Sequence, residues 1–188
     1  LYVPEAIEPW PAAELERLPG YSLTEIGFRV LSAFARGEID PATLRLVVDS
    51  ALDFPIPVVG VDRDVFALEL FHGPTLAFKD VGARVMARLM AVLGGDVTVL
   101  TATSGDTGSA VAHAFHGVAN ARVFVLYPDG RVSPTQEAQL TLFNDDPRSN
   151  VRAFATAGSF DDCQRLVKAA FANEPLRKRV RLTSANSI

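Results

Sequence analysis

The spacing of hydrophobic positions divides the chain into a helical first part and an alternating second part. In the first part, apolar residues at helical spacing predict a helix that is capped near Ser22 and ends at Gly37. The Asp-Pro pair at 40–41 predicts a second helix, because an acidic N-cap and a proline at the first helical position both favour a helix start. Phe-Pro-Ile-Pro at 54–57 interrupts this pattern and is interpreted as a linker. We therefore expect residues 1–57 to form an N-terminal helical segment.

From about residue 60 onward, predicted strands and helices alternate. Short apolar runs predict strands, and longer amphipathic stretches predict helices. The predicted strands are residues 65–70, 97–102, 122–126, 151–155 and 180–183. The predicted helices are residues 80–93, a stretch that follows the loop 103–108 and ends near 117, and residues 133–143 and 159–173. The first of these helices is predicted to have one apolar face, formed by Val81, Val85, Leu89 and Val92, and the last begins at Ser159 with a capping-box-like pattern. Strands that alternate with helices at this spacing are joined by right-handed crossovers, so we expect an α/β fold with a doubly wound parallel sheet.

Composition and charge narrow the possible partners. With 48% hydrophobic and 21% charged residues, the chain has enough apolar surface to form a buried core. A dispersed net charge of −4 argues against a nucleic-acid or anionic-membrane surface, and no apolar run is long enough to span a membrane. The lone Cys163 excludes a disulfide framework and a cysteine-built zinc site, and the histidines show no metal-ligand pattern. We expect no metal and a cytoplasmic location.

Lys79 is the first candidate for chemistry. It lies in the run FHGPTLAFKD at 71–80, where a turn is followed by the start of a helix. The helix dipole and apolar neighbours both disfavour a charged amine there, which lowers its pKa and makes it a nucleophile able to form a Schiff base. The residues alone leave a second interpretation open, in which Lys79 extends into solvent or pairs with Asp80. The other two lysines, Lys168 and Lys178, are expected to be solvated.

Two polar segments follow predicted strands and are candidates for ligand binding. The loop 103–108, Thr-Ser-Gly-Asp-Thr-Gly, combines glycines, hydroxyls and a helix start, which together suit a carboxylate or phosphate. Ligands of open parallel sheets bind at the carboxyl ends of strands, where this loop must lie. Asp106 would repel an anion unless it faces a donor or a cation. The second segment, TSANSI at 183–188, follows the last strand; ordinary polar turns remain an alternative for both.

Four runs of sequence resemble one family. LELFHGPTLAFKD, TATSGDTGSAVAHAF, LYPDGRVSPTQEAQ and LTSANSI occur in the order found in bacterial threonine synthases, and the resemblance covers essentially the whole chain. These are fold-type-II enzymes, of the tryptophan synthase β type, that use pyridoxal 5'-phosphate (PLP). The resemblance implies a lyase that converts O-phospho-L-homoserine and water to L-threonine and phosphate, in the last step of threonine biosynthesis.

The resemblance also implies roles for individual residues. Lys79 matches the lysine that holds PLP as a Schiff base, and Asp106 matches the position that faces the phenolic oxygen of the cofactor. That contact would give Asp106 the donor it needs. His72 and Thr75 belong to the lysine motif and are expected only to orient it. The implied substrate-binding positions are Ser104, Gly105, Thr107, Asn186 and Ser187.

Members of the family are much longer than 188 residues. We therefore expect this chain to be an N-terminal portion, with the loop that holds the PLP phosphate and the residue facing the pyridine nitrogen located beyond Ile188. Residues 58–188 would then be a partial PLP-binding core, of which about 95–178 form the smaller lobe. The segment 142–150 is longer than is usual in the family and is expected to change a surface loop only. We expect weak or no stable cofactor binding by these residues alone, and the oligomeric state, monomer or dimer, is open.

Three other function classes remain as alternatives. The chain could belong to another fold-type-II PLP lyase or β-replacing synthase, although these usually carry Asn at the position of Asp106 and lack the HGPTLAFKD run. It could be a threonine-synthase-like binding or regulatory protein without turnover, against which the retention of Lys79 argues. A non-enzymatic Rossmann-like module would require Lys79 to be incidental.

Overall fold

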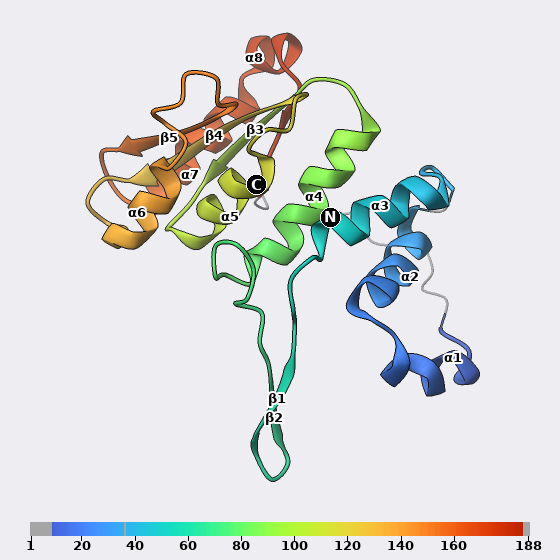
Figure 1. The fold of residues 1–188 in the computed structure, drawn as a ribbon. Helices are drawn as coiled ribbons and strands as arrows, with labels where there is room; N and C mark the ends of the chain where they lie inside the picture. The colour runs from blue at the N-terminus through green and yellow to red at the C-terminus, as the bar shows by residue number, and fades with distance from the viewer. Residues whose placement is uncertain (1–8, 36, 186–188) are drawn as a thin grey trace.

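A computed structural model describes residues 9–35 and 37–185 of the chain. A helical segment, a projecting hairpin and a four-stranded sheet follow one another along the sequence (Figure 1). The helices are α1 (Ala12–Arg17), η1 (Leu18–Gly20), α2 (Leu23–Ala35), α3 (Pro41–Ala51), α4 (Lys79–Leu93), α5 (Asp106–Phe115), α6 (Pro134–Thr141), α7 (Phe160–Ala172) and α8 (Glu174–Arg179). The strands are β1 (Val58–Asp62), β2 (Val65–Leu68), β3 (Val97–Ala102), β4 (Ala121–Pro128), β5 (Val151–Thr156) and β6 (Leu182–Thr183).

The helical segment confirms both helices that the sequence predicts before residue 54. Asp40 caps α3, since its carboxylate accepts the Thr43 N–H at 3.0 Å. The apolar face of α3 is buried, with Val48 and Ala51 fully enclosed. In contrast, no residue of α2 is buried, and Phe34 is 61% exposed. The apolar face of α2 is therefore only partly covered: Phe28 and Leu31 pack against the buried residues of α3, but neither is fully enclosed.

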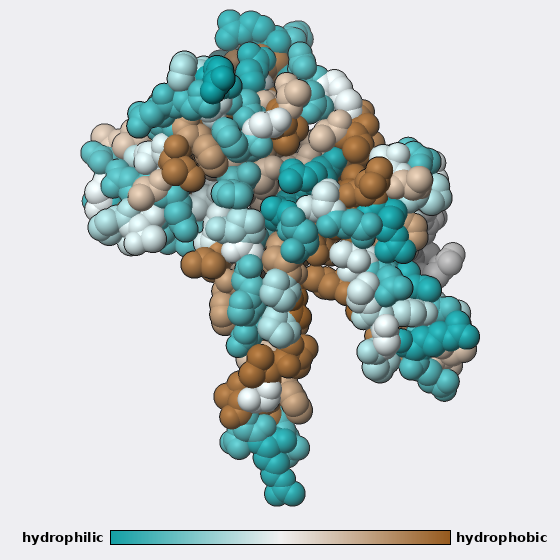
Figure 2. Space-filling view, in the orientation of Figure 1, coloured by the Kyte–Doolittle hydropathy of each residue, from teal (hydrophilic) through white to brown (hydrophobic). Residues whose placement is uncertain are grey.

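β1 and β2 form an antiparallel hairpin in which Val58 pairs with Leu68. The predicted strand at 65–70 is confirmed as β2, but it pairs with β1, which was not predicted, and not with the parallel sheet. The hairpin projects away from the helices and the sheet (Figure 1), and every residue of β1 is exposed. Hydrophobic side chains lie along the stem of the hairpin and polar ones at its tip (Figure 2).

The four remaining strands form a parallel sheet in the order β5-β4-β3-β6. Alternate residues of β3 face opposite sides: Val99 packs in one cluster with Val111 of α5, and Ala102 packs in another with Val167 of α7. Helices thus cover both faces of the sheet (Figure 1), which confirms the doubly wound α/β prediction. β6 is shorter than predicted, and the helix α8 that precedes it was not predicted.

α4 uses two faces, whereas the sequence predicts one. Val81 and Val85, on the predicted apolar face, pack against α3, but Val92 at the end of that face is exposed. Ala83 and Ala87, on a different face, belong to the main core beneath the sheet. Because both faces are packed, the start of α4 is held firmly between the helical segment and α5.

Arg84 strengthens this connection. Its guanidinium is nearly buried and donates to the Ala51 carbonyl at 2.8 Å and to the Asp53 carboxylate at 2.6 Å. The carbonyl groups at the end of a helix lack partners within the helix, and a cation there also complements the helix dipole. Arg84 therefore joins the end of α3 to α4.

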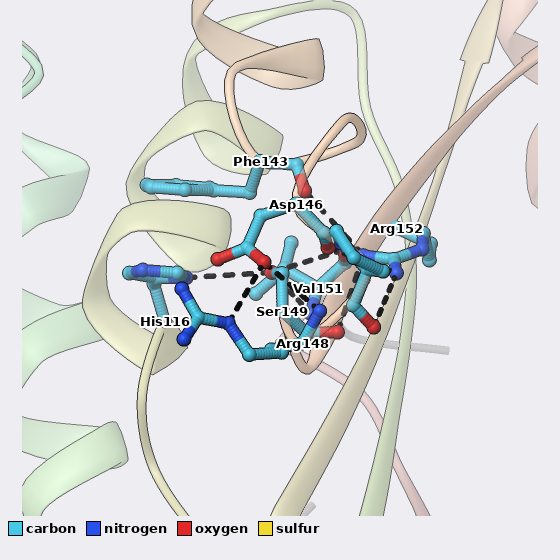
Figure 3. Close-up of polar contacts among 8 residues, drawn as sticks. His116, Phe143, Asp146, Arg148, Ser149, Val151 and Arg152 are labelled. Atoms are coloured by element: carbon cyan, nitrogen blue, oxygen red, sulfur yellow. Dashed lines mark hydrogen bonds and ion pairs between the residues drawn. The ribbon is translucent and has the colours of Figure 1, made fainter.

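The segment between α6 and β5 is ordered by Arg152 (Figure 3). Its guanidinium donates to the carbonyls of Asp146 at 3.1 Å and Ser149 at 3.1 Å. Nearby, His116 stacks on Phe143 with ring centroids 3.9 Å apart, and the Arg148 N–H holds the pKa of the Asp146 carboxyl below its usual value. This segment leads into the amino end of β5, so it lies at the opposite edge of the sheet from the carboxyl ends of the strands.

Candidate functional site

The strand order identifies one position along the sheet where a ligand is expected. From β3 the chain adds β4 and β5 on one side, and it then returns to add β6 on the other side of β3. The order therefore reverses between β3 and β6, and open α/β sheets bind ligands in the crevice beyond the carboxyl ends of strands at such a point. The loop that starts at Thr103 and the segment that starts at Ser184 both lie there.

A pocket of about 500 Å³ adjoins this point. It is formed by the segment before α4, the starts of α4 and α5, and the segment after β6. Its lining residues are Leu70, Phe78, Lys79, Val81, Gly82, Ala83, Met86, Thr107, Val111 and Ala185. The structure thus brings together two positions that the sequence singles out separately, Lys79 and Thr107, in a pocket with mainly apolar walls.

Lys79 is the first residue of α4. Its Nζ lies 3.8 Å from the centroid of the Phe78 ring, and it forms no ion pair within the described ranges. The interpretation that Lys79 pairs with Asp80 is wrong, because Asp80 is bound elsewhere. Lys168 is exposed, and Lys178 is exposed and pairs with Glu174 at 2.7 Å, in agreement with their prediction as solvated residues.

Asp80 closes the loop that precedes Lys79. Its carboxylate is 1% exposed and accepts both the Thr75 N–H at 2.9 Å and the Thr75 hydroxyl at 2.7 Å. Gly73 packs directly on this carboxylate, since a Cβ there would lie 2.6 Å from Asp80 Oδ2. Leu76 takes the left-handed conformation with φ 60°, which is uncommon for a side chain of this size. The clamp therefore fixes a strained turn immediately before Lys79.

His72 lies outside this clamp. Its Nε2 is 2.6 Å from the Glu69 carboxylate, and its ring packs against Phe71 with centroids 4.7 Å apart. The contact is part-exposed and close to the base of the hairpin. His72 is therefore placed to support the start of the lysine loop.

Thr103 shapes the loop after β3 from within. Its buried hydroxyl oxygen accepts the N–H groups of Gly105 at 3.0 Å and Gly108 at 2.8 Å. Those two N–H groups point inward and are not available to a ligand, whereas the first turn of α5 contributes further N–H groups. This start of a helix favours an anion, as the sequence predicts.

Asp106 has a donor, and it comes from α6. Gln136 Nε2 donates to Asp106 Oδ1 at 2.8 Å. Gly105 lies over the same amide: its φ is 140°, and a Cβ there would be 2.3 Å from Gln136 Nε2, so only glycine fits. Neither the clamp formed by Asp80 nor the contact of Gln136 was predicted. Asp80 had a local signal, its position directly after the lysine, whereas Gln136 had none.

The other predicted site residues are placed as follows. Ser104, Gly105 and Asp106 lie on the loop directly before Thr107, and Ser104 and Asp106 are exposed. Asn186 and Ser187 lie outside the described residues. Within the residues that the structure describes, no group of three or more His, Cys, Asp or Glu side chains could hold a metal ion. The same ranges contain no helix long and apolar enough to cross a membrane.

Comparison with known families defines the class of protein. Residues 54–184 match the family described as pyridoxal-phosphate dependent enzyme, and residues 1–52 match the description threonine synthase N terminus. The first match covers more than half of the chain. The chain therefore belongs to the pyridoxal-phosphate dependent enzyme family, as the lysine motif indicates.

Within that family, the chain is similar to threonine synthases. It is 48% identical over 184 residues to threonine synthase of Serratia marcescens, covering 91% of this chain and 42% of the relative. It is 49% identical over 184 residues to that of Escherichia coli strain K12, again with 91% and 42% coverage. The chain thus spans less than half the length of these relatives.

Solved structures give the same result. The PLP-bound threonine synthase of Brucella melitensis superposes with a TM-score of 0.91 at 42% identity, over 100% of this chain and 42% of that one. The yeast threonine synthase superposes with a TM-score of 0.85 at 32% identity, over 99% of this chain and 40% of that one. Both fold and sequence therefore relate this chain to one group of PLP enzymes.

Proposed function

We propose that this chain is the lysine-bearing part of a threonine synthase, which converts O-phospho-L-homoserine and water to L-threonine and phosphate with PLP as cofactor. The observation that carries the proposal is that Lys79 and Thr107, which come from two separate motifs, line one pocket at the topological switch point. The similarity to threonine synthases over nearly the whole chain supports the choice of reaction.

The residues at this pocket fit PLP. The apolar walls suit a pyridine ring, and the amine of Lys79 lies at the pocket without a competing ion pair in the described part of the chain. The first turn of α5 adds N–H donors for an anionic group. When bound, PLP supplies an electron sink for negative charge that develops on the substrate carbons.

The roles of the chain's own residues follow from this placement. Lys79 would hold the cofactor through Nζ, and the substrate's amine would displace Nζ from the cofactor. The freed Nζ would then accept the α-proton and move protons to and from the β-carbon. The walls formed by Val81, Ala83 and Met86 would exclude bulk water during these transfers.

Groups from the two loop segments would bind the substrate and orient the cofactor. The N-terminus of α5, with Ser104 and Thr107, would bind the substrate carboxylate, because the helix dipole and the N–H groups favour an anion there. Gly105, whose N–H is held by Thr103, would line the same site without donating to it. Asp106 would face the phenolic oxygen. We also propose that Asn186 and Ser187 donate to the leaving phosphate, on which charge builds up as the bond breaks.

The test uses the full-length protein. It should show the visible absorption of lysine-bound PLP and should produce both phosphate and threonine from O-phosphohomoserine. Lys79→Ala should abolish the absorption and reduce turnover by several orders of magnitude, on the order of 10³-fold or more. The exposed lysine variants Lys168→Ala and Lys178→Ala are matched controls and should keep both properties.

Two results would contradict the proposal. A colourless wild-type protein would remove the PLP assignment. Phosphate release without threonine would assign the chain to another lyase of the same fold type.

We further propose that the chain divides near residue 57 and that residues of about 95–178 form a smaller lobe. We also propose a cytoplasmic location, because the single cysteine, Cys163, is free and buried.

A further inference from the structure

Gln136 has two partners, and both ends of its amide are used. Oε1 accepts the Ser133 N–H at 3.0 Å, while the Gln136 N–H donates to Ser133 Oγ at 3.2 Å, which completes a capping box at the start of α6. Nε2 donates to Asp106 Oδ1 at 2.8 Å. Only the NH₂ group can donate to a carboxylate, so these contacts fix the orientation of the amide.

The capping box of α7 shows what the cap alone requires. There the third helical residue is Asp162, whose carboxylate accepts the Ser159 N–H at 2.6 Å. An acid at this position caps the helix and also complements its dipole. The cap of α6 would therefore accept a glutamate as well as a glutamine. A glutamate, however, would place a second carboxylate against Asp106, so the contact with Asp106 accounts for the glutamine.

α6 is held firmly enough to position a neighbour. Leu140 is fully buried in the main core, and the Tyr127 hydroxyl donates to Glu137 at 3.2 Å. Burial raises the pKa of the Tyr127 hydroxyl, and the hydrogen bond to Glu137 raises it further. Gln139, one turn after Gln136, donates to the Thr75 carbonyl at 3.5 Å. The helix therefore contacts both loops at the pocket, one through each glutamine.

We propose that Gln136 is the positioning residue for Asp106. It holds Oδ1, so that Oδ2 is presented to the cofactor in one orientation, and the Gly105 backbone is seated on its amide. The inference rests on the proposed function, in which Asp106 faces PLP. Gln136 acts through Asp106 and does not itself touch substrate.

Gln136→Glu in the full-length protein separates positioning from capping. Glutamate keeps the size and the capping box but replaces the donor with a carboxylate, and two adjacent carboxylates share a proton. At about pH 8 we expect the dissociation constant of PLP to rise roughly tenfold and its visible absorption to shift. At about pH 5 the shared proton restores a donor, so the difference from wild type should shrink.

A second variant tests the direction of the hydrogen bond. Asp106→Asn combined with Gln136→Glu exchanges donor and acceptor, and should remove the pH dependence that Gln136→Glu creates. Asp162→Asn, in the capping box of α7, is the control and should leave the absorption unchanged. Gln136→Glu with wild-type affinity and absorption at both pH values would overturn the inference and leave Gln136 as a helix cap only.

The same variants have a readout that does not need the cofactor. In the cofactor-free protein, Gln136→Glu should lower the midpoint of thermal unfolding more at about pH 8 than at about pH 5, and the double variant should not. Equal midpoint changes at both pH values would overturn the inference. A colourless wild type with the expected unfolding pattern would contradict the proposed function but retain the Gln136–Asp106 contact.

Discussion

The two loops that meet at the pocket are held in place by different means. The lysine loop is closed by Asp80 through Thr75, five residues away in the sequence. The loop after β3 is closed from within by Thr103, but its Asp106 is held by Gln136, thirty residues away on another helix. The first loop therefore takes its shape as α4 forms, whereas the second depends on where α6 packs. Chemistry that needs both loops depends on local structure and on tertiary structure together.

The largest expected loss of stability comes from breaking the lysine loop. Asp80→Ala removes the acceptors of both the Thr75 N–H and the Thr75 hydroxyl, in a fully buried site. Unsatisfied buried polar groups cost about 1–3 kcal/mol each, so we expect the free energy of unfolding to fall by about 3 kcal/mol. Urea denaturation of the purified protein measures this change.

The control for this variant is Asp49→Ala, at an exposed position on α3, which should change stability by less than about 0.5 kcal/mol. If Asp80→Ala also falls within that range, the buried clamp does not hold the loop.

A smaller effect is expected in the loop after β3. Thr103→Val keeps the shape of the side chain but removes the oxygen that accepts two N–H groups. The removed acceptor is a neutral hydroxyl and not a carboxylate, and hydrogen bonds to neutral groups contribute less, so we expect a loss of about 2 kcal/mol. Thr103→Ser retains the acceptor and should recover most of this loss. A serine variant as unstable as the valine variant would show that the methyl group, not the hydrogen bonds, matters.

The smallest effect lies outside both loops, at the cap of α7. The Ser159 N–H, the Ser159 hydroxyl and Arg165 lower the pKa of Asp162 from 3.8 to about 2. A carboxyl whose pKa is lowered by folding stabilises the protein at pH values above the ordinary pKa of that carboxyl. This contribution is lost as the pH falls from about 4 to about 2. Ser159→Ala should therefore destabilise the protein more at neutral pH than in acid, where only the loss of the hydroxyl that accepts the Asp162 N–H remains. Parallel stability curves over this pH range would contradict the assignment.

The fold was largely predictable where burial follows periodicity. β3 and the cap of α7 by Ser159 follow directly from the sequence pattern, because a buried strand and a capping box each have local signals. β1 was missed because its apolar residues are exposed, which the pattern of neighbouring residues does not reveal. The packing of α4 was only half predicted, since its small residues Ala83 and Ala87 form the face toward the core.

The site was predictable only as far as its motifs are local. Lys79 and the loop of Thr107 stand out by composition and by resemblance, and the alternation of strands and helices places that loop at a sheet edge. The Gln136–Asp106 contact has no sequence signal, because it depends on the packing of α6. The pairing of Asp80 with Thr75 and not with Lys79 required knowledge of the turn between them.

The most direct test of the proposed function is to identify the lysine that holds the cofactor. Borohydride reduction of the full-length protein joins PLP permanently to the amine that carries it, and mass spectrometry of the peptides then locates the added mass. We expect the label on Lys79 and none on Lys168 or Lys178. A label on either of those lysines, or an unlabelled Lys79 in a protein that retains PLP, would contradict the proposed function.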